Sequence, residues 1–148
     1  MGTCTLFLAS CGGSSTGSNG GGGNGGGGNG GGGGSDRNVS FSEDIEPIFN
    51  GNCAVSGCHN ATTQESGVNL SSHDAALSSV GDQYGIEVIQ PGEPNAYNPQ
   101  TGEGSPIVDK IENDNPTFGE RMPLNSGALD QAEIDSIKAW IDDGAPNN

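Results

Sequence analysis

A glycine-rich tract, residues 12–35, limits what this chain can fold into more than any other feature of its sequence. Most of its other residues are Asn and Ser, so the tract has no apolar surface to bury and little to fix its backbone. We expect a flexible coil with a typical end-to-end distance of about 27 Å. The tract therefore divides the chain into an N-terminal segment, 1–11, a linker, 12–35, and one small domain, 36–148.

The N-terminal segment ends in Leu8-Ala9-Ser10-Cys11, which resembles a bacterial lipobox, where the peptide is cut before a cysteine that then carries lipid. No Lys or Arg precedes it, and its apolar stretch is shorter than a signal-peptide core. The alternative is a frayed terminus with a chance cysteine. No apolar run approaches the ~18–20 residues of a membrane span. The lipobox interpretation therefore predicts a periplasmic or cell-surface protein, anchored to a bacterial membrane through lipid on Cys11 rather than through a transmembrane helix.

The charge of the chain excludes one class of partner. Four basic residues against nineteen acidic ones give a net charge of −15, whereas nucleic-acid binding needs a basic surface. The same balance disfavours electrostatic docking on anionic lipid head groups. The acidic surface either keeps the protein soluble or steers it toward a basic partner.

Apolar periodicity and capping residues predict a fold built from short helices. We expect helices over about 43–51, 72–80 and 106–112, and a last helix that starts after Asp130 and ends before Gly144. Asp130 and Glu133 form a capping-box pattern, and Ser71 with Asp74 forms another. The one strand-like piece, 86–89, is too short for a sheet. The expected fold class is all-α, with long loops.

Chemistry is concentrated in Cys53-Ala-Val-Ser-Gly-Cys58-His59. Covalent haem attachment needs two nearby thiols that add to the vinyl groups, followed at once by a His that binds the iron; the usual spacing is C-x-x-C-H. Here four residues separate the cysteines, and Gly57 can supply the turn that the longer loop needs. The motif predicts one covalently attached haem c held by Cys53, Cys58 and His59.

Two other sites could use the same residues. A Cys53–Cys58 disulfide is possible in an oxidising compartment, although it closes a very small loop and leaves His59 without a role. A zinc site would need Cys53, Cys58, His59 and His73, but the usual H-x3-5-H spacing is absent.

Met122 and His73 are the candidates for a sixth iron ligand. Met122 lies in the turn Gly119-Glu-Arg-Met-Pro123, where a Met that fills a gap in the core, the alternative interpretation, would be out of place. His73, in the first turn of a Ser-capped helix, is expected to face solvent. A Met ligand raises the reduction potential relative to two His ligands.

The predicted core is thin, because hydrophobic residues make up 30% of the chain and aromatic residues 5%. A domain of this size buries only about 60–70% of the surface that its unfolded chain exposes. We therefore expect the haem to join the helix near 41–49 to the helix near 129–141, and the haem-free chain not to fold.

The order of motifs resembles the planctomycete-type cytochrome c domain, a branch of the monohaem class I-like cytochromes, over nearly all of 41–146. The motifs are Phe41-x-x-x-Ile45-x-x-Ile48, Cys…Cys-His, Gly67-Val-Asn-Leu70, Pro91-Gly-x-Pro94, Ser105-Pro-Ile-Val, Arg121-Met-Pro123 and Ile137-x-x-Trp140-Ile-x-x-Gly144-Ala145. The resemblance implies a cytochrome c-like helical fold around one covalent haem. It also implies His59 and Met122 as axial ligands, with Trp140 packed near the haem. The loop over 95–104 is longer than in the family pattern.

The expected function is electron transfer rather than catalysis: a membrane-tethered monohaem c-type cytochrome that carries single electrons between redox partner proteins, whose docking surfaces would be basic. No acid–base pair or substrate pocket is visible in the sequence. One alternative is a haem enzyme or sensor, such as a peroxidase-like domain, whose sixth iron position can open. Another is a haem-free, disulfide-stapled surface lipoprotein that binds a protein.

Overall fold

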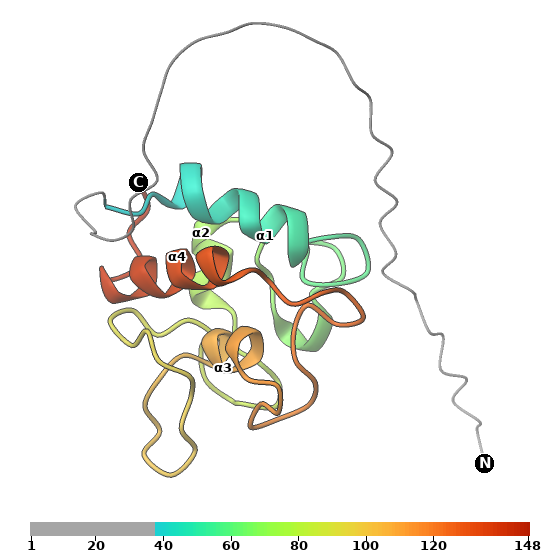
Figure 1. The fold of residues 1–148 in the computed structure, drawn as a ribbon. Coiled ribbons are helices and arrows are strands. Elements are labelled where there is room, and N and C mark those ends of the chain that lie inside the picture. The colour runs from blue at the N-terminus through green and yellow to red at the C-terminus, as the bar shows by residue number, and fades with distance from the viewer. Residues whose placement is uncertain (1–37) are drawn as a thin grey trace, which may run out of the picture.

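The computed structural model describes residues 38–148. The predicted anchor Cys11, the segment 1–11 and the linker 12–35 lie outside the described residues, so those predictions stay predictions. Within 38–148 there is no helix long and apolar enough to cross a membrane. The C-terminus lies beside the start of the domain (Figure 1), where the carbonyl oxygen of Asn148 accepts a hydrogen bond of 3.1 Å from the Ser42 N–H.

The domain opens with a π-helical turn, η1 (Phe41–Ile45), that runs directly into helix α1 (Glu46–Asn52). The Ser40 hydroxyl caps the turn by accepting a hydrogen bond from the Glu43 N–H, as a short polar side chain does at a helix start. Pro47 lies in the first turn of α1, where its missing N–H costs no helical hydrogen bond. The predicted helix over 43–51 is confirmed with slightly wider bounds.

The remaining helices are close to their predicted positions. Helix α2 spans His73–Ser78 and is capped by Ser72 rather than by the predicted Ser71. Helix α3 spans Pro106–Glu112, and helix α4 spans Gln131–Asp142 with both hydrogen bonds of the Asp130–Glu133 capping box present. A short 3-10 turn, η2 (Glu65–Gly67), was not predicted. The described part of the chain contains no named strand, only isolated bridges such as Val80 to Glu87, so the all-α fold class is confirmed.

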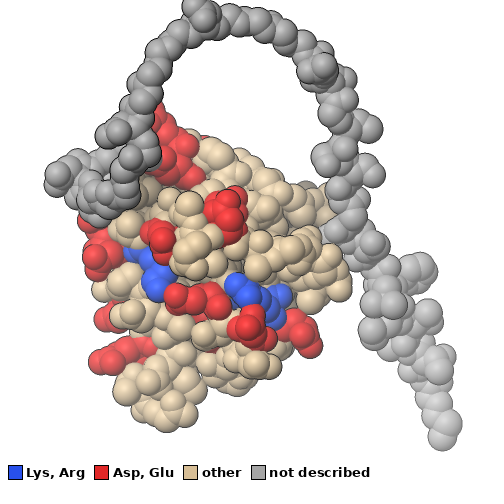
Figure 2. Space-filling view, viewed as in Figure 1, with Lys and Arg blue, Asp and Glu red and all other residues tan. Residues whose placement is uncertain are grey.

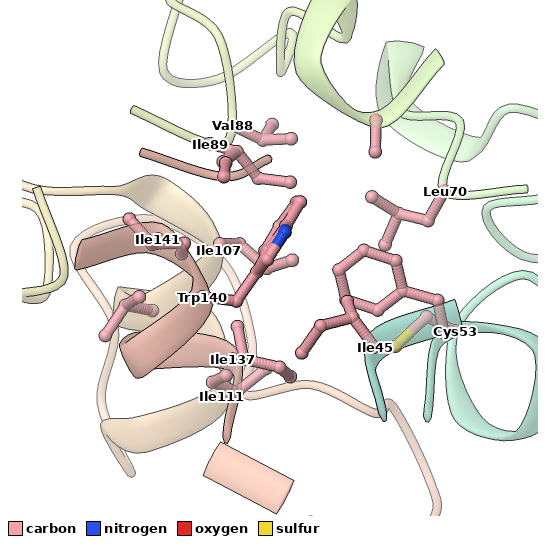
Figure 3. Close-up of a cluster of buried hydrophobic side chains, with 14 of the residues drawn as sticks. Ile45, Cys53, Leu70, Val88, Ile89, Ile107, Ile111, Ile137, Trp140 and Ile141 are labelled. Carbon is pink, nitrogen blue, oxygen red and sulfur yellow. The ribbon is translucent and has the colours of Figure 1, made fainter. Parts of the chain in front are cut away.

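The core joins the first and last helices directly. Figure 1 shows α1 running along α4, with α3 beneath them. The Trp140 ring lies 5.5 Å from the Phe41 ring and 6.3 Å from the Phe49 ring, between centroids, and Figure 3 shows Trp140 at the centre of the buried cluster. The expectation that haem would join these helices is therefore wrong: aromatic packing joins them, and Trp140 is fully buried.

Long loops connect the helices and are held by side chains of the helix ends. Ser105 precedes α3, but its hydroxyl does not cap the helix. The hydroxyl instead donates to the Glu93 carbonyl at 2.9 Å and accepts from the Gln90 N–H at 2.9 Å. The longer loop over 95–104 is closed by a bridge between Asn98 and Glu103. These contacts fix the loops that precede α3, and α3 forms one wall of the pocket described next.

Candidate functional site

A mostly apolar pocket opens between α3 and the loops that follow α1. Its empty volume, which includes open solvent at its mouth, is about 720 Å³. Its apolar walls include Val68, Leu70, Val88, Ile107 and Ile111. Three of the predicted site residues, Cys53, His59 and Met122, also line it. The fold therefore brings together residues that are up to 69 positions apart in the chain.

The loop from Cys53 to His59 starts where α1 ends. Cys53 is the C-cap residue of α1, and its N–H donates to the Phe49 carbonyl at 2.8 Å. The loop then closes on itself, because the His59 N–H donates to the Cys53 carbonyl at 3.1 Å. Gly57 has a φ of +84°, a left-handed conformation that glycine adopts without a steric cost. The predicted role of Gly57 in the longer loop is confirmed, and the turn returns His59 to the side of Cys53.

The Cys53 thiol is almost fully buried, with 8% of the residue exposed. Burial, reinforced by the negative charge of Glu133, raises the pKa of this thiol to about 12. Figure 3 shows its sulfur at the rim of the apolar cluster. The thiol therefore stays protonated and faces a water-poor wall, where an apolar group can lie against it.

His59 is oriented by one ring nitrogen. Its Nδ1 lies 3.1 Å from the Glu65 carbonyl oxygen; because a carbonyl only accepts, Nδ1–H is the donor and Nε2 keeps its lone pair. Burial is the main cause that lowers the pKa of His59 from its usual value. When a neutral imidazole binds a metal through one ring nitrogen, its other ring nitrogen usually donates a hydrogen bond, often to a backbone carbonyl.

Cys58 lies in the same loop but is not among the residues that line the pocket. Within residues 38–148 no disulfide joins Cys53 to Cys58, and no cluster of three or more His, Cys, Asp and Glu side chains suits a metal ion. Neither the disulfide nor the zinc alternative receives support from this part of the chain.

Met122 reaches the pocket from a loop that is tied to the end of α3. The Met122 N–H donates to the Lys110 carbonyl at 2.8 Å. Arg121 donates from Nε and Nη2 to the Ile111 carbonyl, at 3.2 and 3.0 Å, and pairs with Asp114. Arg121 is therefore neither a solvated surface residue nor a pocket residue. It fastens the loop one residue before Met122.

His73 lies away from the pocket. Its Nε2 is 2.8 Å from the Ala145 carbonyl oxygen and its Nδ1 is 3.0 Å from the Asp74 carboxylate. The side chain is 12% exposed and packs edge-on against Phe41. The expectation that His73 faces solvent is wrong, because it completes the aromatic core. With both nitrogens engaged, His73 is a poor candidate for an iron ligand here, which leaves Met122.

Two further pocket residues were missed by the sequence reasoning. Tyr84 and Lys110 both line the pocket, and the Lys110 ammonium lies 5.9 Å from the centre of the Tyr84 ring. Lys110 could have been found from its position, since it is three residues after Ile107 and therefore shares a helix face with it. Tyr84 lies in an irregular loop, where no periodic pattern indicates which side chains point inward.

Trp140 does not line the pocket. The resemblance implied that it packs near the haem, but its ring belongs to the cluster between η1, α1 and α4, and its indole N–H donates to the Pro146 carbonyl at 2.9 Å. It supports α4 rather than the pocket wall.

A family model described as Planctomycete cytochrome C matches residues 56–123. The match contains Cys58, His59 and Met122, and begins three residues after Cys53. Neither a curated protein nor a solved structure matches the chain significantly. The pocket fits the covalently bound haem c of such domains, because it is apolar, has a thiol in its wall, and is lined by an imidazole and by a thioether. This match supports a planctomycete-type cytochrome c domain around residues 56–123, and with it a haem-based role in electron transfer.

Proposed function

We propose that this chain is a membrane-tethered monohaem c-type cytochrome that carries single electrons between redox partner proteins. The observation that supports this most strongly is the convergence of Cys53, His59 and Met122 on one apolar pocket. A pocket that excludes water on most sides favours one fixed ligand arrangement in both oxidation states, which suits a carrier.

The proposed roles follow from chemistry and position. Cys53 and Cys58 would hold one haem c through thioether bonds, and His59 and Met122 would be the ligands of its iron. Haem supplies an iron that gains and loses one electron. The chain orients the His59 ring through Glu65, at 3.1 Å from Nδ1, and it excludes water with the aliphatic side chains of α3 and of the loop around Leu70.

The acidic surface of the domain supports the proposal that its redox partners have basic docking surfaces. The basic residues among 38–148 are all engaged within the domain: Lys138 pairs with Glu112, Arg121 with Asp114, and the Lys110 ammonium binds carbonyls of the Met122 loop. Figure 2 shows acidic side chains spread over the visible face, with few basic ones among them. With the chain's net charge of −15, a basic docking surface on the partner would speed encounter, and the rate would fall with added salt.

The proposed anchor is Cys11, with residues 12–35 as the tether. One acyl chain binds a membrane weakly, so stable attachment needs at least two. With a complete signal peptide supplied, we expect Cys11→Ser to move the protein from the membrane to the soluble periplasmic fraction, and Ser10→Ala, the matched control, to leave it in the membrane. Membrane association of the Cys11→Ser variant at the parent level would contradict the anchor.

Carbon monoxide distinguishes the carrier from the alternative, a haem enzyme or sensor whose sixth position can open. The reduced parent should bind carbon monoxide poorly, whereas Met122→Ala should bind it at least about tenfold more tightly, since the position is then open. Met122→His should stay low-spin and lower the potential. Tight binding by the parent itself would overturn the carrier proposal and favour the enzyme or sensor.

A further inference from the structure

Helix α3 contains a buried carboxylate that the proposed electron-transfer role does not use. Asp109 is 1% exposed and ranks with the fully buried side chains of the domain. An ionised carboxylate is costly to bury unless donors surround it. The hydrogen-bond donors around Asp109 therefore indicate which segments the carboxylate holds in place.

Three hydrogen bonds surround the carboxylate. Oδ2 accepts from the Tyr84 hydroxyl at 2.7 Å and from the Thr117 backbone N–H at 2.8 Å, and Oδ1 accepts from the Asn113 amide at 2.6 Å. Burial alone would raise the pKa of Asp109, but these donors outweigh it and hold the pKa below its usual value. Asp109 is therefore an ionised acceptor with donors on both oxygens.

Two partners of Asp109, Tyr84 and Thr117, come from different loops. Tyr84 is a pocket-lining residue, whereas Thr117 begins the segment that leads to Met122. The Tyr84 ring also packs edge-on against Phe118 of that segment, with 5.0 Å between centroids. The Asp109 carboxylate thus connects Tyr84, in the pocket wall, to Thr117, the first residue of the segment 117–122, which we call the Met122 loop.

The residues that follow Asp109 continue this attachment along the loop. The Lys110 ammonium donates to the carbonyls of Phe118 and Glu120, and the Lys110 carbonyl accepts from the Met122 N–H at 2.8 Å. The segment 117–122 therefore follows the last turn of α3 from Asp109 onward. Thr117 is the first point at which the loop is fixed.

We propose that Asp109 is a positioning residue for Met122: its hydrogen bonds to Tyr84 and Thr117 hold the Met122 loop against the pocket wall so that the thioether stays on the iron. The proposal rests on the proposed function, in which Met122 is the sixth ligand. A thioether is a neutral ligand, so its affinity for the iron increases when the loop that carries it is already held in the binding position. Asp109 does not line the pocket, so it acts only through the loop.

The test compares holoprotein variants by the sulfur-to-iron charge-transfer band of the ferric form and by cyanide binding. Asp109→Ala removes all three acceptor contacts; we expect a weaker band and cyanide association about tenfold faster, because a larger fraction of the protein has Met122 dissociated. Asp109→Asn keeps an oxygen for Tyr84 and Thr117, and we expect it to stay near the parent. A parental band and rate in Asp109→Ala would overturn the proposal, as would equal losses in both variants.

A second pair keeps the test decisive if Asp109→Ala does not fold. Thr117→Pro removes the N–H that donates to Asp109, whereas Thr117→Ser keeps both this N–H and the hydroxyl. We expect the proline variant alone to lose band intensity and bind cyanide faster; equal behaviour of the two would overturn the proposal. A parent that lacks the band contradicts Met122 as ligand and hence the proposed function. A parent with the band and unchanged variants contradicts only the role of Asp109.

Discussion

At the scale of single residues, the hydrogen bonds of a side chain decide whether it is available to a ligand in the pocket. His59 donates from Nδ1 to the Glu65 carbonyl, and its side chain lines the pocket. His73 has the same ring but uses both nitrogens within the core. The two histidines of the chain therefore have different surroundings: His59 lines the pocket, whereas His73 is part of the core.

Asp109 gives a prediction of pH dependence. Its pKa is lowered in the folded protein, so the unfolded chain binds more protons at acid pH, and the stability from this group is present above its unfolded pKa and is lost as pH falls through the folded one. We expect Asp109→Asn to be less stable than the parent near neutral pH, with the difference shrinking from about pH 5 to about pH 3. Thermal melts of both proteins across that range measure it.

The control for this experiment is Asp142→Asn, which removes the same charge from an exposed position on α4. Its difference from the parent should stay small across the range, because surface substitutions cost little. A stability difference between Asp109→Asn and the parent that stays constant down to pH 3 would contradict the prediction, because it would show that the charge of Asp109 does not stabilise the fold.

The sequence predicts individual residues best where chemistry demands a fixed local spacing. Cys53, His59 and the turn at Gly57 follow from a motif only seven residues long. Met122 followed from the shortage of other ligands, and the structure adds that it lines the same pocket. Asp109 and Tyr84 could not be predicted, because their pairing joins residues 25 positions apart through a loop without periodicity.

At the scale of elements, local signals predicted the helices well because the residues that start and end a helix are its neighbours in sequence. The Asp130–Glu133 box and the proline at the start of α3 are read from neighbouring residues. Loops were harder to predict. The Ser105 hydroxyl bonds to Gln90 and Glu93 instead of capping α3. Tertiary contacts, rather than the local sequence, decide which of these bonds forms.

The capping box of α4 gives a prediction of stability. Asp130 accepts from the Glu133 N–H at 2.9 Å, and the Asp130 N–H donates to the Glu133 carboxylate at 3.0 Å. We expect Asp130→Ala to lower the free energy of unfolding by about 1 kcal/mol, the usual cost of losing an N-cap. Urea unfolding of the holoprotein measures it.

Gln131→Ala is the matched control at the next position, since its amide contacts only the exposed Asp135 side chain at 2.8 Å among its side-chain hydrogen bonds. It should cost no more than a few tenths of a kcal/mol. Equal losses in both variants would mean that the capping box does not stabilise α4. The haem spectrum of Asp130→Ala should stay parental, because α4 does not line the pocket.

At the scale of the whole molecule, the domain has two regions that are held together differently. In one, Phe41, Phe49 and Trp140 join the first and last helices by direct packing. In the other, loops and α3 surround the apolar pocket. A haem bound through the 53–59 loop would fill the second region, so the haem completes the pocket side of the fold rather than the helix pair that the sequence suggested.

This division predicts how the haem-free chain behaves. Without haem the apolar pocket walls face water, and a group that binds only the folded state no longer stabilises it. We expect the double variant Cys53→Ser, Cys58→Ser to lose its cooperative thermal transition by circular dichroism. Met122→Ala, which keeps the covalent attachment, should retain the transition. A haem-free variant that melts cooperatively near the parental temperature would contradict this prediction.

The central claim is that one haem is bound covalently through the loop from Cys53 to His59. The most direct measurement is the intact mass of the protein made with a c-type cytochrome maturation system, followed by peptide mapping. The account predicts the polypeptide plus one haem, retained after acid extraction and found on the peptide that contains Cys53 and Cys58. A polypeptide without haem, one lighter by the two hydrogens of a disulfide, or a haem lost on extraction would contradict it.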